Sequence, residues 1–163
     1  MNLDALGRPL AVGLILALVG LLPFAFMALT SFVKIATVLQ IVRSAIGAQG
    51  VPSSTVVLAL GAALTLIAMA PVGAQMAERL QPVLARSSAE PGELIADAIT
   101  AVREPLRGFL AHNASAKERE RFSNLARRKH PKDAQISDTD LLVVVPAFLV
   151  SELRAAFSLG FAI

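Results

Sequence analysis

Residues 9–33 read PLAVGLILALVGLLPFAFMALTSFV, twenty-five residues without a charged side chain. A second uncharged run of 34 residues covers 44–77, and a third apolar run covers 141–163 with only Glu152 and Arg154 charged. A helix needs about 20 apolar residues to cross the ~30 Å hydrocarbon core of a bilayer. The three runs therefore predict an all-α membrane protein.

Charge is concentrated between the second and third apolar runs. Residues 78–140 carry 21 of the 27 charged side chains, 11 basic and 10 acidic. Over the 163 residues, 55% are apolar, against 45 to 50% in ordinary soluble domains, which argues against a soluble enzyme. The net charge of +3 is small, and basic and acidic residues are mixed along the chain, so we expect no nucleic-acid partner.

The segment between the first two runs has the composition of a turn. Gly47 or Gly50 can take the left-handed conformation that ends a helix, and Ser53 or Ser54 can cap the next helix. We therefore expect a first hydrophobic helical hairpin at 1–77, a polar and mostly helical insert at 78–140, and the start of a second hydrophobic hairpin at 141–163.

Proline interrupts every apolar run, at Pro23, Pro71 and Pro146. An interior proline removes one backbone hydrogen bond and clashes with the preceding turn, so these helices should kink or break. Carbonyl groups freed at membrane depth need partners in neighbouring protein or in a water-filled cavity, because lipid provides none. Although proline is common in transmembrane helices, its presence in all three runs favours an assembly of several subunits.

Polar side chains follow one side of the helix that leads into the turn. At 100° per residue, an arc of roughly 120° contains Thr30, Lys34, Thr37, Gln40 and Ser44. This polar stripe fits contact with a second subunit or the wall of a water-filled passage. The alternative is a helix end that emerges among lipid headgroups.

Two charges in apolar sequence need partners. Lys34 follows 25 uncharged residues, and Glu152 lies inside the third apolar run. An ionised group in the bilayer is costly unless it is paired, hydrated or near the interface. Their opposite signs make Lys34 and Glu152 the natural pair, in a structural role or, alternatively, as a proton-coupled site. Arg154 competes as a local partner of Glu152 but lies on a different helix face.

The polar insert contains two predicted helices. The first covers about 93–111, and the second begins with a capping box formed by Ser115 and Glu118 and reaches about Lys129. Ser137 or Asp138 should then cap the helix that enters the third apolar run.

Catalysis has little support in the sequence. Ser31 and Lys34 lie one helical turn apart, as in Ser–Lys hydrolases, but so short a pattern often arises by chance. His112 and His130 lack metal-site spacing, and without cysteine there are no thiolate sites, so we expect neither metal nor cofactor. A small transporter or channel subunit would share the charges and broken helices, but should show an internal repeat, which we do not find.

Four stretches in order resemble the FliP/SctR family, the core membrane subunits of the type III protein export apparatus. They are LLPF at 21–24; TSFVK at 30–34, continuing through RSAIG at 43–47 to Pro52; LT at 64–65 through MAPV at 69–72; and PAF at 146–148 through SEL at 151–153 and AF at 156–157 to GF at 160–161. PLR at 105–107 and FL at 109–110 in the insert also look familial.

The resemblance implies a non-enzymatic subunit of a multi-subunit export gate in the bacterial inner membrane. It implies a homo-oligomer that joins FliQ/SctS-like and FliR/SctT-like subunits around a conduit for unfolded protein substrates. It also implies that the hairpins need not lie across the bilayer. The lack of a signal peptide favours the virulence branch over the flagellar one.

Two departures from the family stand near the end of the chain. Ser158 and Leu159 replace a long polar residue and an isoleucine or methionine, and the chain stops at Ile163 where the family continues into a hairpin with a methionine-rich loop. We therefore expect a C-terminally incomplete chain. Lys34 and Arg43 flank the turn of the first hairpin, so the positive-inside rule places that turn in the cytoplasm and the insert in the periplasm.

Overall fold

The computed structural model describes residues 3–47, 52–86, 90–129 and 136–162. These ranges form helices and no strand, which confirms the all-α class: α1 Leu3–Leu29, α2 Phe32–Ala45, α3 Ser54–Leu84, α4 Pro91–Asn113, α5 Ala116–Lys129 and α6 Leu141–Gly160. By length and composition α3 and α6 can each cross a membrane. The end of α1 together with α2 makes a third span if that bent pair is counted as one.

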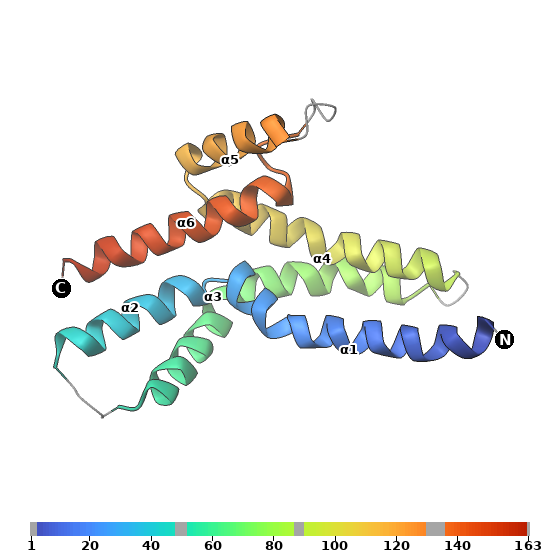
Figure 1. Ribbon diagram of the computed structural model, residues 1–163, viewed down its shortest axis with the longest axis horizontal. Helices are drawn as coiled ribbons and strands as arrows, with labels where there is room; N and C mark the ends of the chain where they lie inside the picture. The colour runs from blue at the N-terminus through green and yellow to red at the C-terminus, as the bar shows by residue number, and fades with distance from the viewer. Residues whose placement is uncertain (1–2, 48–51, 87–89, 130–135, 163) are drawn as a thin grey trace.

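Helix α2 lies between two neighbours. It packs against α6 on one side and against α3 on the other, and α3 also packs against α4. Figure 1 shows α2 beside α6, with α5 on the side of α6 that faces away from α2. Helix α1 contacts α2 and α6 through its end, while its N-terminus lies at the far side of the molecule (Figure 1).

The sharpest change of direction in the first apolar run falls between α1 and α2. The segments Leu16–Leu29 and Phe32–Ala45 meet at 69°. Thr30 Oγ1 donates to Phe26 O at 2.6 Å and accepts from Phe32 N at 3.3 Å. The hydroxyl therefore satisfies a carbonyl and an N–H group that the interrupted helix leaves free, which a break at membrane depth requires.

None of the three prolines ends a helix. Helix α1 runs through Pro23, α3 through Pro71 and α6 through Pro146. Of the two outcomes expected at these positions, a kink or a break, the helices do not break, because a helix can lose one hydrogen bond to proline and continue with a bend. Figure 1 shows α3 changing direction about midway along its length, and Pro71 lies near the middle of its residue range.

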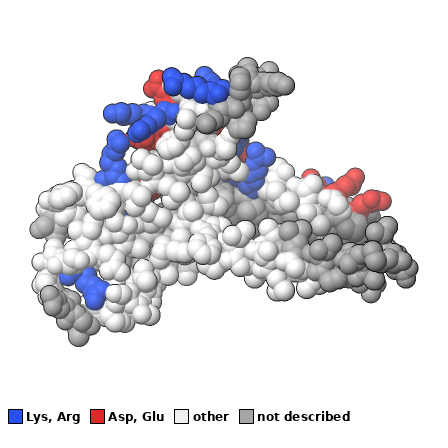
Figure 2. Space-filling view, in the orientation of Figure 1, with Lys and Arg blue, Asp and Glu red and all other residues white. Residues whose placement is uncertain are grey.

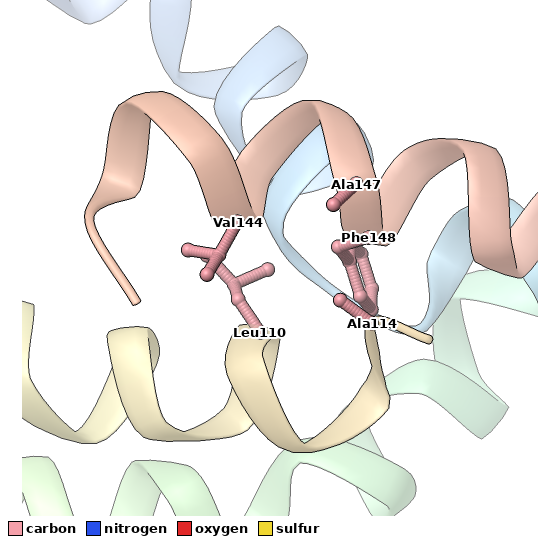
Figure 3. Packing of buried hydrophobic residues seen from close by; sticks show 5 residues of the cluster. All are labelled: Leu110, Ala114, Val144, Ala147 and Phe148. Carbon is pink, nitrogen blue, oxygen red and sulfur yellow. The ribbon is translucent and has the colours of Figure 1, made fainter. Parts of the chain in front are cut away.

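The polar insert shares its core with the third apolar run. Five residues of α4, α6 and the connection after α4 form the buried cluster that Figure 3 shows: Leu110, Ala114, Val144, Ala147 and Phe148. The Phe109 ring packs at 5.6 Å from that of Phe148, measured between ring centroids. Full burial of one such large apolar side chain contributes about 1.5–3 kcal/mol. The expected boundary at 77–78 is not marked by a helix end, since α3 continues to Leu84.

The helix ends identify which predicted caps the chain uses. Gly47 has φ +67°, and Ser53 Oγ accepts from Val56 N at 3.4 Å at the start of α3; Gly50 lies outside the described residues. The cap predicted at Ser137 or Asp138 is wrong, because the residue preceding α6 is Asp140. Its carboxylate instead accepts from Ser137 N at 2.8 Å, which closes the turn before the helix.

Candidate functional site

The structure brings together the two charges that stand in apolar sequence. Lys34 Nζ of α2 lies 2.8 Å from Glu152 Oε1 of α6. The Lys34 side chain is 35% exposed, but that of Glu152 is only 4% exposed. A carboxylate removed from water to this degree needs a counter-charge, and the contact supplies one.

Glycine residues line both helices that flank α2. Gly61 of α3 lets Ala36 of α2 approach, and a Cβ atom added to Gly61 would lie 3.7 Å from Ala36 Cβ. On the other side of α2, a Cβ atom added to Gly160 of α6 would come within 2.6 Å of Ile41 Cδ1. Helix α2 therefore has an ordinary van der Waals contact at Gly61 of α3, and a contact at Gly160 of α6 that leaves no room for a side chain.

The other members of the polar stripe do not meet a common partner. The Thr30 hydroxyl serves the break after α1, and Ser44 Oγ donates to Gln40 O at 2.9 Å. Thr37 and Gln40 are half-buried, and their side chains form no hydrogen bond to another described residue. Of the stripe, only Lys34 is committed to a charged partner within the described chain.

A second ion pair on α6 was not predicted from the sequence. Arg154 Nη2 lies 2.9 Å from Glu118 Oε1 of α5, and Glu118 is only 1% exposed. Neither Glu118 oxygen meets hydrogen-bond geometry with a described residue, so this contact is an ion pair without a directed hydrogen bond. Arg121 Nη1 approaches the other oxygen at 4.0 Å.

The predicted capping box forms only in half. Ser115 Oγ accepts from Glu118 N at 3.3 Å as expected, but the carboxylate does not return to Ser115 N. Ser115 N instead donates to Ser151 Oγ of α6 at 2.9 Å. The pairs Ser115/Glu118 and Ser151/Arg154 share the same three-residue spacing, which is the one sequence signal from which their contact could have been inferred.

The described residues contain no arrangement that points to reaction chemistry. Ser31 Oγ contacts Met69 Sδ at 3.9 Å, while Lys34 is paired with Glu152, so the two side chains are directed to different helices. No group of three metal-type ligands occurs in the described ranges. His112 is exposed, and His130 lies outside these ranges. The two ion pairs join α6 to α2 and to α5, and each pair contains a buried carboxylate.

The fold and this site define an all-helical protein with two or three helices of membrane-spanning length, joined by ion pairs at α6. The FliP family model matches residues 15–163. This chain therefore belongs to the FliP family.

Named relatives agree with this assignment. The chain is 36% identical to the hypersensitivity response secretion protein HrcR of Ralstonia nicotianae over 145 residues, 88% of this chain and 67% of the relative. It is 37% identical to the virulence protein YscR of Salmonella typhimurium over 155 residues, 93% and 70% of the two chains. It is 35% identical to the Yop proteins translocation protein R of Yersinia pestis over 153 residues, 92% and 69%.

Proposed function

We propose that this protein is a core inner-membrane subunit of a type III protein export gate. The observation that carries the proposal is the family match, which extends over residues 15–163 and includes all of α2 to α6. Relatives named for secretion and for translocation, at 36% and 35% identity, support a role in protein export, and a third, at 37%, is named for virulence. Their names also favour a virulence system over a flagellar one.

In this proposal several copies of the chain join FliQ/SctS-like and FliR/SctT-like subunits around a conduit for unfolded substrates. Two features of the surface support contact with other subunits. Helix α1 exposes large apolar side chains between Val12 and Met27, among them Leu16 at 66% and Phe24 at 64%. Thr37 and Gln40 of the polar stripe are accessible on α2 without a described partner, so an incoming subunit can offer them hydrogen bonds.

The Lys34–Glu152 pair has a structural role in this account. The pair holds α2 against α6. Because α2 carries the polar stripe, the pair also determines which surface of α2 faces a neighbouring subunit. An ammonium group held 2.8 Å from a carboxylate also favours a permanent ion pair over a hydrolytic base. We further propose that the α2–α3 turn faces the cytoplasm and the insert the periplasm, as the charges beside the turn indicate.

Copurification with partner subunits tests the function. The protein, tagged at its N-terminus and expressed from its own locus, should copurify with the FliQ/SctS-like and FliR/SctT-like subunits after mild detergent extraction. A matched control carries the same tag on an unrelated multi-pass membrane protein. Recovery of the tagged protein without either partner, under conditions that preserve the rest of the secretion complex, would contradict the proposal.

A further inference from the structure

Three basic side chains gather where α5 begins, and we call them the basic cluster: Lys117, Arg121 and Arg154. Arg154 and Arg121 approach the two oxygens of Glu118 at 2.9 and 4.0 Å. Their side chains are 59% and 73% exposed, whereas Glu118 is 1% exposed. Lys117 is exposed and precedes Arg121 by one helical turn. Two cations thus approach one buried anion, and the exposed Lys117 adds a third positive charge to the same end of α5. Figure 2 shows basic side chains gathered around α5.

The basic cluster lies at a boundary along α6. The α6 face that carries Ser151 and Arg154 is covered by α5 through the Ser115 and Glu118 contacts. Phe157 and Phe161 follow Arg154 by three and seven residues, so they lie on the same face one and two turns further on. They are 51% and 91% exposed. Within the described residues, this face of α6 therefore changes at Arg154 from a part covered by α5 to a part with exposed aromatic side chains.

If only the end of α6 after Arg154 enters a bilayer, instead of the whole helix crossing it, this boundary is the level at which the bilayer begins. Exposed charges on α5, such as Arg121, cannot lie in hydrocarbon without a large cost, whereas exposed phenylalanine rings beyond Arg154 gain by leaving water. If Phe157 and Phe161 are in contact with acyl chains, the basic cluster stands at the level of the headgroups. A hollow of about 370 Å³ between Arg121, Leu125 and Arg128 continues this surface along α5.

We propose that the basic cluster binds an anionic phospholipid, with the phosphate on Arg121 and Lys117 and the acyl chains along Phe157 and Phe161. Guanidinium groups match phosphate oxygens in a two-point contact, and the adjoining aromatic surface suits the chains. Arg154 is partly committed to Glu118 and positions the cluster on α6. The proposal requires that these helices meet a bilayer and does not depend on the export function.

Lipid titration of the 163-residue protein in detergent tests the proposal. The chain has no cysteine, so a cysteine placed at exposed Ser158 carries a single environment-sensitive dye. Short-chain phosphatidylglycerol should shift its emission at concentrations at least tenfold lower than phosphatidylcholine. The K117Q/R121Q double variant should reduce that preference about tenfold or more, because each cation near an anionic headgroup contributes several-fold to binding. Arg154 is left unchanged because it pairs with Glu118.

The matched control is the R79Q/R103Q variant, which removes two exposed arginines from α3 and α4. It should keep the full preference for phosphatidylglycerol. Equal binding of the two lipids, or equal losses in both variants, would overturn the proposal. Inorganic phosphate that displaces phosphatidylglycerol completely at millimolar concentration would identify a small-anion site and overturn the lipid assignment. None of these results bears on copurification with the export subunits, so the two proposals fail separately.

Discussion

Glu152 and Arg154 lie two residues apart on α6 and reach different helices, Glu152 to Lys34 of α2 and Arg154 to Glu118 of α5. Positions two residues apart on a helix are separated by about 200°, so neighbouring opposite charges need not pair with each other. Each pair instead contains one carboxylate that is almost completely buried. Helix α6 is thereby joined to α2 on one side and to α5 of the polar insert on the other.

The two partners of the first ion pair should not be equally sensitive to truncation. Lys34→Ala leaves the 4% exposed Glu152 carboxylate without a counter-charge, and loss of one partner of a buried pair typically costs about 3–5 kcal/mol. Glu152→Ala leaves an ammonium group whose side chain is 35% exposed and can be hydrated, so it should cost less. Thermal unfolding followed by circular dichroism in detergent should give the lower Tm for Lys34→Ala. Arg79→Ala, at an exposed site, is the control; equal Tm values for all three would show that the pair does not form.

Gly160→Ala should loosen the contact between α2 and α6. The added methyl group would lie 2.6 Å from both Ile41 Cδ1 and Ile41 Cγ2, so the helices must separate or the isoleucine must change rotamer. Overpacking of this kind costs about 1–3 kcal/mol. Ile41→Ala in the same chain should recover part of the lost Tm. Gly73→Ala meets no atom within 4 Å and should leave the Tm unchanged or raise it. A neutral Gly160→Ala would contradict this packing.

Ser151→Ala should release the first turn of α5. Ser151 Oγ accepts from Ser115 N at 2.9 Å, and loss of a helix-cap contact typically costs about 0.5–2 kcal/mol. Hydrogen exchange followed by mass spectrometry should therefore show faster exchange in peptides that cover 115–122, with α3 unchanged. Ser158→Ala, at an exposed site two turns further along α6, is the matched control. If both variants exchange alike, the contact between α5 and α6 does not hold the turn.

Cysteine labelling tests the proposed topology. In intact spheroplasts an impermeant thiol reagent should modify Asn124→Cys on exposed α5, because the insert is assigned to the periplasm. Ile46→Cys, 73% exposed beside the α2–α3 turn, should react only after lysis. The native chain has no cysteine, so each variant reports one position. The opposite pattern would place the insert in the cytoplasm.

Long apolar runs and turn chemistry made much of the fold predictable. The uncharged runs specified the helix class, Gly47 and Ser53 supplied the expected ends around the first turn, and the capped start of α5 followed Ser115. Lys34 and Glu152 could be paired because charges of opposite sign are rare in apolar sequence. These predictions depend on local composition, and helix formation is determined largely by residues that are close in sequence.

Features that depend on three-dimensional packing were not predictable in the same way. The residues around Thr30 do not predict that the helix breaks there and that the Thr30 hydroxyl bonds to the freed backbone groups. They also do not predict that the helix continues through Pro23. Glu118 reads as one charge among many on a solvated helix, and its burial depends on the approach of Arg154 from 36 residues further along the chain. On a helix with many charges of both signs, only the structure shows which side chains are buried in ion pairs.

Assembly of charge-reversal variants tests most directly whether the Lys34–Glu152 contact supports an export-gate subunit. Blue-native electrophoresis would compare the native protein with Lys34→Glu, Glu152→Lys and the double exchange, each expressed from its own locus with tagged partner subunits. We predict a complex for the native protein, little or none for either single variant, and partial recovery for the double exchange, because only the double exchange restores opposite charges. Equal assembly of all four proteins would contradict the structural role of the pair, and absence of a partner-containing complex for the native protein would contradict the proposed function itself.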